Sequence, residues 1–175
     1  MPTANRPTAR LFSRARMLFL ALIAATLAQL AWYYPRLPAR VASHFDAAGQ
    51  ANAFMPKDGF LAIHLVVLGI LAVVFLLIPA LIGRLPPSMI NLPNKDYWLA
   101  PERRAGTFAY IEQFFAWFGC ALLLLVVFAM GLAMRANFSD PVQLPTVPIV
   151  SAIAAFILFN IAGVIAMHRR FSTIR

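Results

Sequence analysis

The sequence predicts an all-α fold: an integral membrane bundle of four transmembrane helices with both termini cytoplasmic. Hydrophobic residues make up 62% of the 175-residue chain and charged residues only 12%, whereas soluble domains are about half apolar and about a quarter charged. The apolar residues come in four long runs, each able to cross the hydrocarbon core of a bilayer. Lys and Arg residues cluster beside these runs, as they do in membrane proteins.

The first run, residues 17–34, follows a basic N-terminal segment, residues 1–16. It ends in two tyrosines after Trp32, an aromatic belt typical of the membrane interface, and Pro35 then breaks the helix. A cleaved signal peptide is the alternative, because a basic start, an apolar middle and small residues near Ala28 also fit one. The length of the run and its aromatic end favour a retained helix.

The other elements follow from the same alternation of apolar and polar stretches. Pro101 and Glu102 are typical of a helix start, so a helix from Pro101 is expected to run directly into the third span. The predicted order is a first pair of spans (17–82) with an outer loop (35–59) between them, a cytoplasmic loop (83–107), third and fourth spans (108–167), and a basic tail (168–175).

Charge counting orients the bundle. The N-terminus, the loop 83–107 and the tail hold eleven of the fifteen Lys and Arg residues, and the other two loops hold four. The positive-inside rule therefore places both termini and loop 83–107 in the cytoplasm and loop 35–59 outside. The same distribution explains the net charge of +9 by membrane topology, and no stretch has the layout of a nucleic-acid module.

The outer loop carries the densest polar pattern between two spans. His44 and Asp46 share one face if the segment is extended, and Gly49 permits a turn that returns Asn52 or Asp58 toward them, so the group is a candidate site for a divalent cation. The favoured interpretation is an ordered turn. In it, Asp46 accepts backbone N–H bonds around Gly49, and Asn52 does the same further on.

The cytoplasmic loop is a second candidate site. Two prolines stiffen it, aromatic side chains suit the headgroup level, and its basic residues suit anionic lipid or a cytosolic partner. Lipid anchoring is the simpler of the two. The residues singled out are Asn91, Pro93, Asn94, Asp96, Tyr97, Trp98 and Arg103.

The polar residues singled out inside the predicted spans are His64, Glu112 and Asn160. An ionisable group in a span is a functional candidate by default, because burying it is costly. His64 lies toward the outer face and Glu112 toward the inner face, so they are poor partners for one catalytic pair. Asn160 is expected to bond a neighbouring helix.

Motifs of known enzyme classes are absent from the sequence. It has no His-Glu-x-x-His, no Gly-x-Ser-x-Gly, no phosphate-binding Gly-rich loop and no paired cysteines. The single cysteine, Cys120, lies in an apolar run and suits packing. These observations predict a protein without catalytic activity, metal or cofactor.

The outer loop resembles the N-terminal membrane domain of SdpI-like immunity proteins. That domain reads roughly Leu-Pro, a gap, His-Phe-Asn, two residues, Gly, two residues, Asp, an aromatic residue and Ser-Lys. His44, Phe45, Gly49 and Lys57 match it, while Asp46 replaces the usual Asn and Asn52 the usual Asp. The resemblance implies a short family member in a bacterial inner membrane, because full-length immunity proteins have additional spans.

The resemblance also implies what such a protein binds. SdpI-type proteins protect a bacterium from a secreted peptide toxin and hold a transcriptional repressor at the membrane. We therefore expect the outer loop, through His44, Asp46, Gly49, Asn52 and Lys57, to bind or sense an envelope-side ligand such as a peptide. The alternatives are a metal-dependent membrane enzyme using His44 and Asp46, and a small transporter or accessory subunit. The lipid bilayer is the expected partner, and the sequence leaves open whether the protein forms a homo-oligomer.

Overall fold

The computed structural model describes residues 6–82 and 85–174 and is mostly helical. Four helices are long and apolar enough to cross a membrane, which confirms the predicted all-α membrane bundle. They are α1 (Arg6–Tyr33), α2 (Lys57–Ile82), α4 (Pro101–Ala136) and α5 (Thr146–Ser172). Residues 1–5 of the predicted N-terminal segment, residues 83–84 of the predicted cytoplasmic loop and residue 175 of the predicted tail lie outside the described residues.

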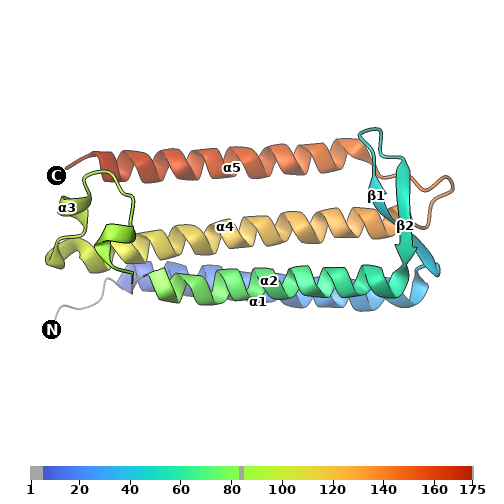
Figure 1. Cartoon of the computed structure of the whole chain (residues 1–175), viewed down its shortest axis with the longest axis horizontal. Helices are drawn as coiled ribbons and strands as arrows, with labels where there is room; N and C mark the ends of the chain where they lie inside the picture. Colours follow the sequence, from blue (N-terminus) through green and yellow to red (C-terminus); the bar gives the residue numbers. More distant parts are fainter. Residues whose placement is uncertain (1–5, 83–84, 175) are drawn as a thin grey trace.

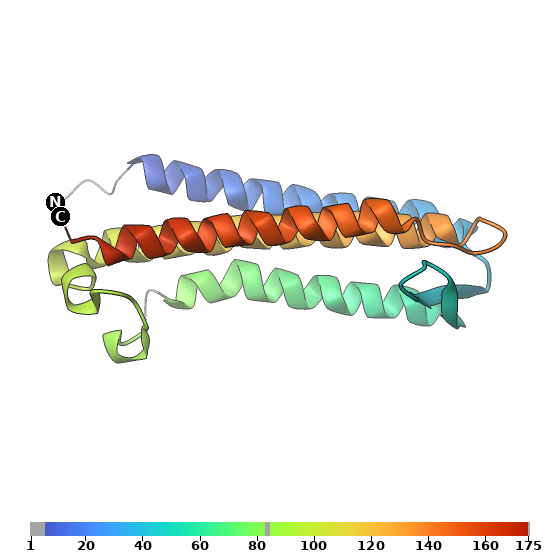
Figure 2. The same cartoon turned by 90° about the horizontal axis from the view of Figure 1, so that it is seen from above.

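The four helices run side by side, with α4 between α5 on one side and α1 and α2 on the other (Figures 1 and 2). The beginning of α1 and the end of α5 lie at the same end of the bundle as the segment that joins α2 to α4. This end is called the basic end below. A two-stranded hairpin covers the opposite end.

Helix α4 is the longest element and the centre of the bundle. Pro101 occupies its first turn and Glu102 follows, so the predicted helix start is confirmed. Side chains of α4 enter both buried clusters, where they meet α1 and α2. The cluster nearer the basic end contains Ala15, Phe19, Leu68, Phe75, Ala116, Cys120 and Leu123. The cluster beneath the hairpin contains Leu30, Leu37, Val41, Phe60, Met130 and Met134.

Two glycines let other helices approach α4 closely. A Cβ atom built on Gly119 would lie 2.6 Å from the ring of Phe75 in α2, and one on Gly131 would lie 2.5 Å from the Gln29 amide nitrogen in α1. Contacts between membrane helices depend on such close approach, because lipid tails are as apolar as the side chains.

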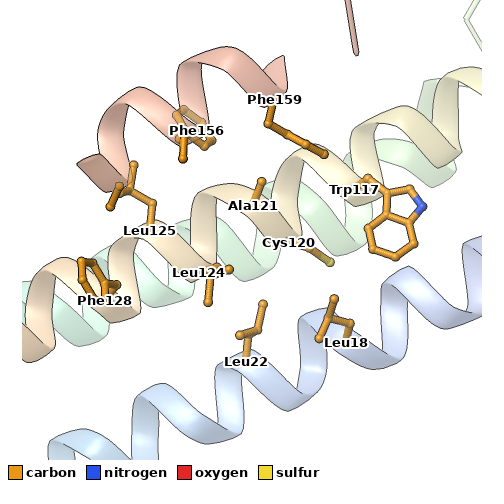
Figure 3. A pocket seen from close by; sticks show the side chains of 12 residues that line it. Leu18, Leu22, Trp117, Cys120, Ala121, Leu124, Leu125, Phe128, Phe156 and Phe159 are labelled. Atoms are coloured by element: carbon orange, nitrogen blue, oxygen red, sulfur yellow. The ribbon is translucent and has the colours of Figure 1, made fainter. Parts of the chain in front are cut away.

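Helix α5 packs mainly on α4, and an apolar groove of about 570 Å³ opens between α1, α4 and α5 (Figure 3). Leu18 and Leu22 of α1 form one wall, and Phe156 and Phe159 of α5 form the other. All the lining side chains are apolar or a cysteine. The groove lies within the membrane-spanning helices and suits contact with lipid acyl chains.

The predicted outer loop, residues 35–59, contains regular structure that the sequence interpretation did not include. Strands β1 (Arg40–Phe45) and β2 (Ala51–Pro56) form an antiparallel hairpin, preceded by the short helix η1 (Tyr34–Arg36). Helix α2 begins at Lys57, directly after β2, rather than at the predicted residue 60. The hairpin residues are polar and apolar in irregular order, and the register shifts on either side of His44. Such bulges obscure the alternation that identifies a strand.

Candidate functional site

The turn of the hairpin is built around Asp46. Its Oδ1 accepts hydrogen bonds from the backbone N–H groups of Ala48 and Gln50, both at 2.9 Å. Gly49 donates its N–H to the Asp46 carbonyl at 2.9 Å and has a φ of +80°. The predicted turn chemistry of Asp46 and Gly49 is therefore confirmed. Asn52 does not share it, because β2 has already begun and its exposed side chain lies outside the turn.

The turn is attached to the loop between α4 and α5, residues 137–145. The Leu144 N–H donates to the Gly49 carbonyl at 2.8 Å, and Gln50 forms an antiparallel bridge with Gln143. A Cβ atom at position 49 would overlap the Leu144 carbonyl oxygen. Gly49 is therefore required twice, for its positive φ and for this close approach.

Asn137 makes a second attachment between the hairpin and α4. Its Oδ1 accepts from the Ala42 N–H at 2.6 Å, and its Nδ2 donates to the Ala42 carbonyl at 3.3 Å and to the Ala133 carbonyl at 2.9 Å. The side-chain amide thus pairs with β1 as a neighbouring strand would. The sequence interpretation missed Asn137. An Asn directly after a long helix is typical of a helix end, but nothing local predicts its pairing with residue 42.

The base of the hairpin is joined to η1 and α2. Tyr34 donates its hydroxyl hydrogen to Asp58 Oδ1 at 2.7 Å, and the Lys57 ammonium lies 5.0 Å from the centre of the Tyr34 ring. The Lys57 N–H donates to the Ala39 carbonyl at 3.0 Å. Lys57 therefore holds the junction between β2 and α2. We call the hairpin together with residues 137–145 the outer cap, after the side of the membrane on which charge counting predicts it to lie.

Two of the residues proposed for a metal site, Asp46 and Asp58, are separated in the cap. Asp46 Oδ1 is engaged in the turn, and Asp58 lies beyond the far end of β2, about 20 Å of strand away at ~3.3 Å per residue. His44 is exposed and pairs with Ala53. Within the described part of the chain, no group of three His, Cys, Asp or Glu side chains is placed to hold a metal.

Strand β2 forms the exposed side of the cap. Its residues Asn52, Ala53 and Phe54 are all exposed, and the Phe54 side chain keeps 46% of its surface accessible. The sheet has two strands, and the outer edge of β1 meets Asn137 at Ala42. Among the described residues, the outer edge of β2 has no strand beside it, and the nearest pairing is the bridge of the preceding residue, Gln50, to Gln143.

The predicted cytoplasmic loop contains η2 (Pro87–Met89) and α3 (Lys95–Trp98) and is docked on the end of α5. Asn94 Nδ2 and Trp98 Nε1 both donate to the Phe171 carbonyl, at 3.0 and 2.9 Å. The Arg103 guanidinium lies 3.9 Å from the centre of the Tyr97 ring. These four predicted residues thus organise the segment. The other three, Asn91, Pro93 and Asp96, are exposed on it.

The polar residues inside the spans have local roles. His64 Nδ1 lies 2.6 Å from the Phe60 carbonyl, one turn earlier in α2. Asn160 donates to the Phe156 carbonyl at 2.7 Å within α5, so the expectation that it bonds another helix is wrong. The amide bonds a carbonyl of its own helix, and none of the most apolar part of α5 is buried inside the bundle. Glu112 is partly buried in α4.

Comparison with known proteins gives one match. Residues 21–70 match the family described as "Domain of unknown function (DUF1648)", a membrane-associated domain. The matched segment covers about the second half of α1, the whole hairpin and about the first half of α2. No curated protein and no solved structure matches the chain. The protein is therefore a multi-pass membrane protein in which residues 21–70, centred on the hairpin, are similar to this domain.

Proposed function

We propose that this protein is a non-enzymatic protein of a bacterial inner membrane, similar to SdpI-type immunity and sensor proteins, and that its outer cap binds an envelope-side peptide. The attachment of the hairpin to α4 carries the proposal. Because Asn137 pairs directly with Ala42, a ligand that moves the hairpin also acts on the end of α4.

The charge distribution supports the orientation. The predicted cytoplasmic stretches 1–16, 83–107 and 168–175 hold eleven of the fifteen Lys and Arg residues, and the described parts of these stretches lie at the basic end. Cytoplasmic segments carry this excess in bacterial membrane proteins. The cap then faces the envelope, where a secreted peptide reaches it without crossing the membrane.

The exposed edge of β2 supports a peptide as the ligand. An unpaired strand edge offers backbone N–H and C=O groups to an extended peptide, which adds as a further strand. Exposed Phe54 supplies an apolar contact beside that edge. On the other side of the sheet, Asn137 already pairs with β1 at Ala42, so β2 is the edge that accepts a peptide.

Helix α4 supplies the connection to the cytoplasm. It has 36 residues and spans about 54 Å at ~1.5 Å per residue. At its far end, Thr107 donates its hydroxyl hydrogen to the Trp98 carbonyl at 2.8 Å, and Arg103 Nε donates to the Tyr97 carbonyl at 2.8 Å. A displacement of α4 therefore acts on the segment that a cytosolic regulator would meet.

A gene deletion complemented with cap variants tests this function. We expect the deletion strain to become more sensitive to at least one peptide in a broad panel of membrane-active peptides, and the wild-type gene to restore resistance. Phe54→Ala is expected to restore it poorly, because it removes the apolar contact beside β2. Phe138→Ala is the matched control, since Phe138 is similarly exposed, at 50%, but lies in the α4–α5 loop.

Two results would contradict the proposal. Unchanged sensitivity of the deletion strain across the whole panel would remove the immunity role. Equal complementation by the Phe54 and Phe138 variants, at matched protein levels in the membrane, would remove the β2 edge as the binding surface.

A further inference from the structure

A small pocket at the basic end is separate from the outer cap. It has a volume of about 290 Å³ and is lined by Trp98, Arg169, Arg170 and Thr173. Three of these residues belong to the end of α5 and the residue after it, and Trp98 ends α3. The pocket therefore exists only because α3 is docked on α5.

That docking depends on aromatic contacts and hydrogen bonds around Phe171. The Phe171 side chain is completely buried, and its ring meets the rings of Trp98 and Tyr110 edge-on, with centroid distances of 5.3 and 5.6 Å. The Phe171 carbonyl accepts from both Asn94 and Trp98. These contacts hold the Trp98 indole in place beside the two arginines.

The aromatic rings also position a cation. The Arg170 guanidinium lies 4.4 Å from the centre of the Tyr110 ring and 5.9 Å from that of Trp98. A guanidinium that stacks on an aromatic ring keeps its N–H groups directed outward in its own plane. Arg169 is exposed beside it. No carboxylate in the described part of the chain pairs with either arginine, so both charges are available to an anion.

The carbonyl groups that end a helix normally repel anions. Here two of them are engaged. The Phe171 carbonyl accepts two side-chain hydrogen bonds, and the Arg169 carbonyl accepts one from the Thr173 hydroxyl at 3.2 Å. Two carbonyl oxygens of the helix end are therefore engaged beside the guanidinium groups of Arg169 and Arg170.

The location selects the kind of anion. The pocket lies at the end of a membrane-spanning helix, where Trp and Tyr rings mark the headgroup level. Guanidinium groups bind phosphate oxygens through paired, charge-assisted hydrogen bonds. We propose that Trp98, Arg169 and Arg170 form a binding site for the phosphate of an anionic phospholipid, which anchors α3 and the end of α5 to the membrane surface.

Native mass spectrometry of the purified full-length protein tests this site. The protein is equilibrated in detergent with equal amounts of phosphatidylglycerol and phosphatidylcholine, and the retained lipid is counted. We expect preferential retention of phosphatidylglycerol. In Arg169→Gln/Arg170→Gln, we expect its affinity to fall at least about tenfold, the typical effect of losing a charge-assisted phosphate contact.

The matched control is Arg14→Gln/Arg16→Gln, which removes the same charge from exposed side chains of α1 at the same end. It is expected to retain phosphatidylglycerol as the wild type does. Since Arg170 also packs on two rings, the single variant Arg169→Gln decides the question if the double variant fails to fold. Arg169→Gln is also expected to retain less phosphatidylglycerol than the wild type does.

Four outcomes would overturn the proposal. The first is an equal loss of phosphatidylglycerol affinity in the two double variants, and the second is an unchanged affinity in both Arg169→Gln and Arg169→Gln/Arg170→Gln. The third is equal retention of the two lipids by the wild type. The fourth is displacement of phosphatidylglycerol by inorganic phosphate at equal concentration. The first would indicate unspecific attraction by charge. The last would identify a free phosphate as the ligand.

Discussion

The pairing of Asn137 with strand β1 makes a specific prediction about the stability of the cap. Replacing Asn137 with Ala removes three hydrogen bonds, two of them to Ala42. Ala42 is completely buried, so its backbone N–H and C=O would lose their partners away from water. We expect Asn137→Ala to loosen the hairpin while the four spanning helices stay in place.

The expected magnitude follows from those two groups. A buried polar group left without a partner costs about 1–3 kcal/mol. Two such groups give a loss of about 2–4 kcal/mol in the free energy of opening the hairpin, since relaxation of the cap and entry of water recover part of the total. Asn137→Asp keeps an acceptor for the Ala42 N–H but loses the donor, so its loss is expected to be smaller.

Hydrogen exchange measured by mass spectrometry on peptides covering residues 40–56 reads this free energy directly. A loss of ~2 kcal/mol corresponds to exchange about thirtyfold faster at the Ala42 amide. The control is Asn52→Ala, because Asn52 is exposed on β2 and its side chain takes no part in the turn. The control is expected to change exchange very little.

Hydrogen exchange of residues 40–56 at the wild-type rate in the Asn137→Ala variant would refute this prediction. The prediction would also fail if Asn52→Ala accelerated exchange as much as Asn137→Ala. Either result would mean that the Asn137 amide does not hold the hairpin to α4.

Three further predictions concern packing and metal. Gly49→Ala is expected to destabilise the cap by at least about 2 kcal/mol, because a side chain at this positive φ is strained and its Cβ atom overlaps the Leu144 carbonyl. Faster hydrogen exchange of the hairpin peptides would confirm this loss, and exchange at the wild-type rate would contradict it. Gly119→Ala is expected to lower the free energy of unfolding in detergent by about 1–3 kcal/mol, because the added methyl group overlaps Phe75. Gly69→Ala is the control and is expected to leave stability unchanged, because Gly69 has open space around it. Equal melting temperatures of the two variants would count against the close contact. Chelator is expected to leave the melting temperature unchanged, and bound metal in the purified protein would speak against this.

Several local features could be predicted from the sequence alone. The helix start at Pro101 and the turn at Asp46 and Gly49 depend on residues within one or two turns of each other. Proline and glycine restrict or extend the local backbone, and a carboxylate near backbone N–H groups forms a turn in many contexts. The number of spans was predictable for a related reason, since each span depends only on its own apolar run.

The hairpin and the hydrogen bond of Asn160 are two features that the sequence did not predict. Bulges on either side of His44 interrupt the alternation by which a strand is identified, so the segment was interpreted as a turn alone. For Asn160, the sequence shows a polar residue in a span but not how closely another helix approaches it. Its amide bonds its own helix, and none of the most apolar part of α5 is buried inside the bundle.

What the sequence determined by itself is therefore the membrane class, the four spans and the local chemistry of the Asp46 turn, because each depends on neighbouring residues. Only the tertiary structure decided how the two ends of the bundle are closed. Asn137 meets Ala42 across 95 residues, and Asn94 and Trp98 meet the Phe171 carbonyl across 77 and 73. Such pairs form because the packing of α4 against its neighbours brings distant polar groups together, and a buried backbone group must find a partner there.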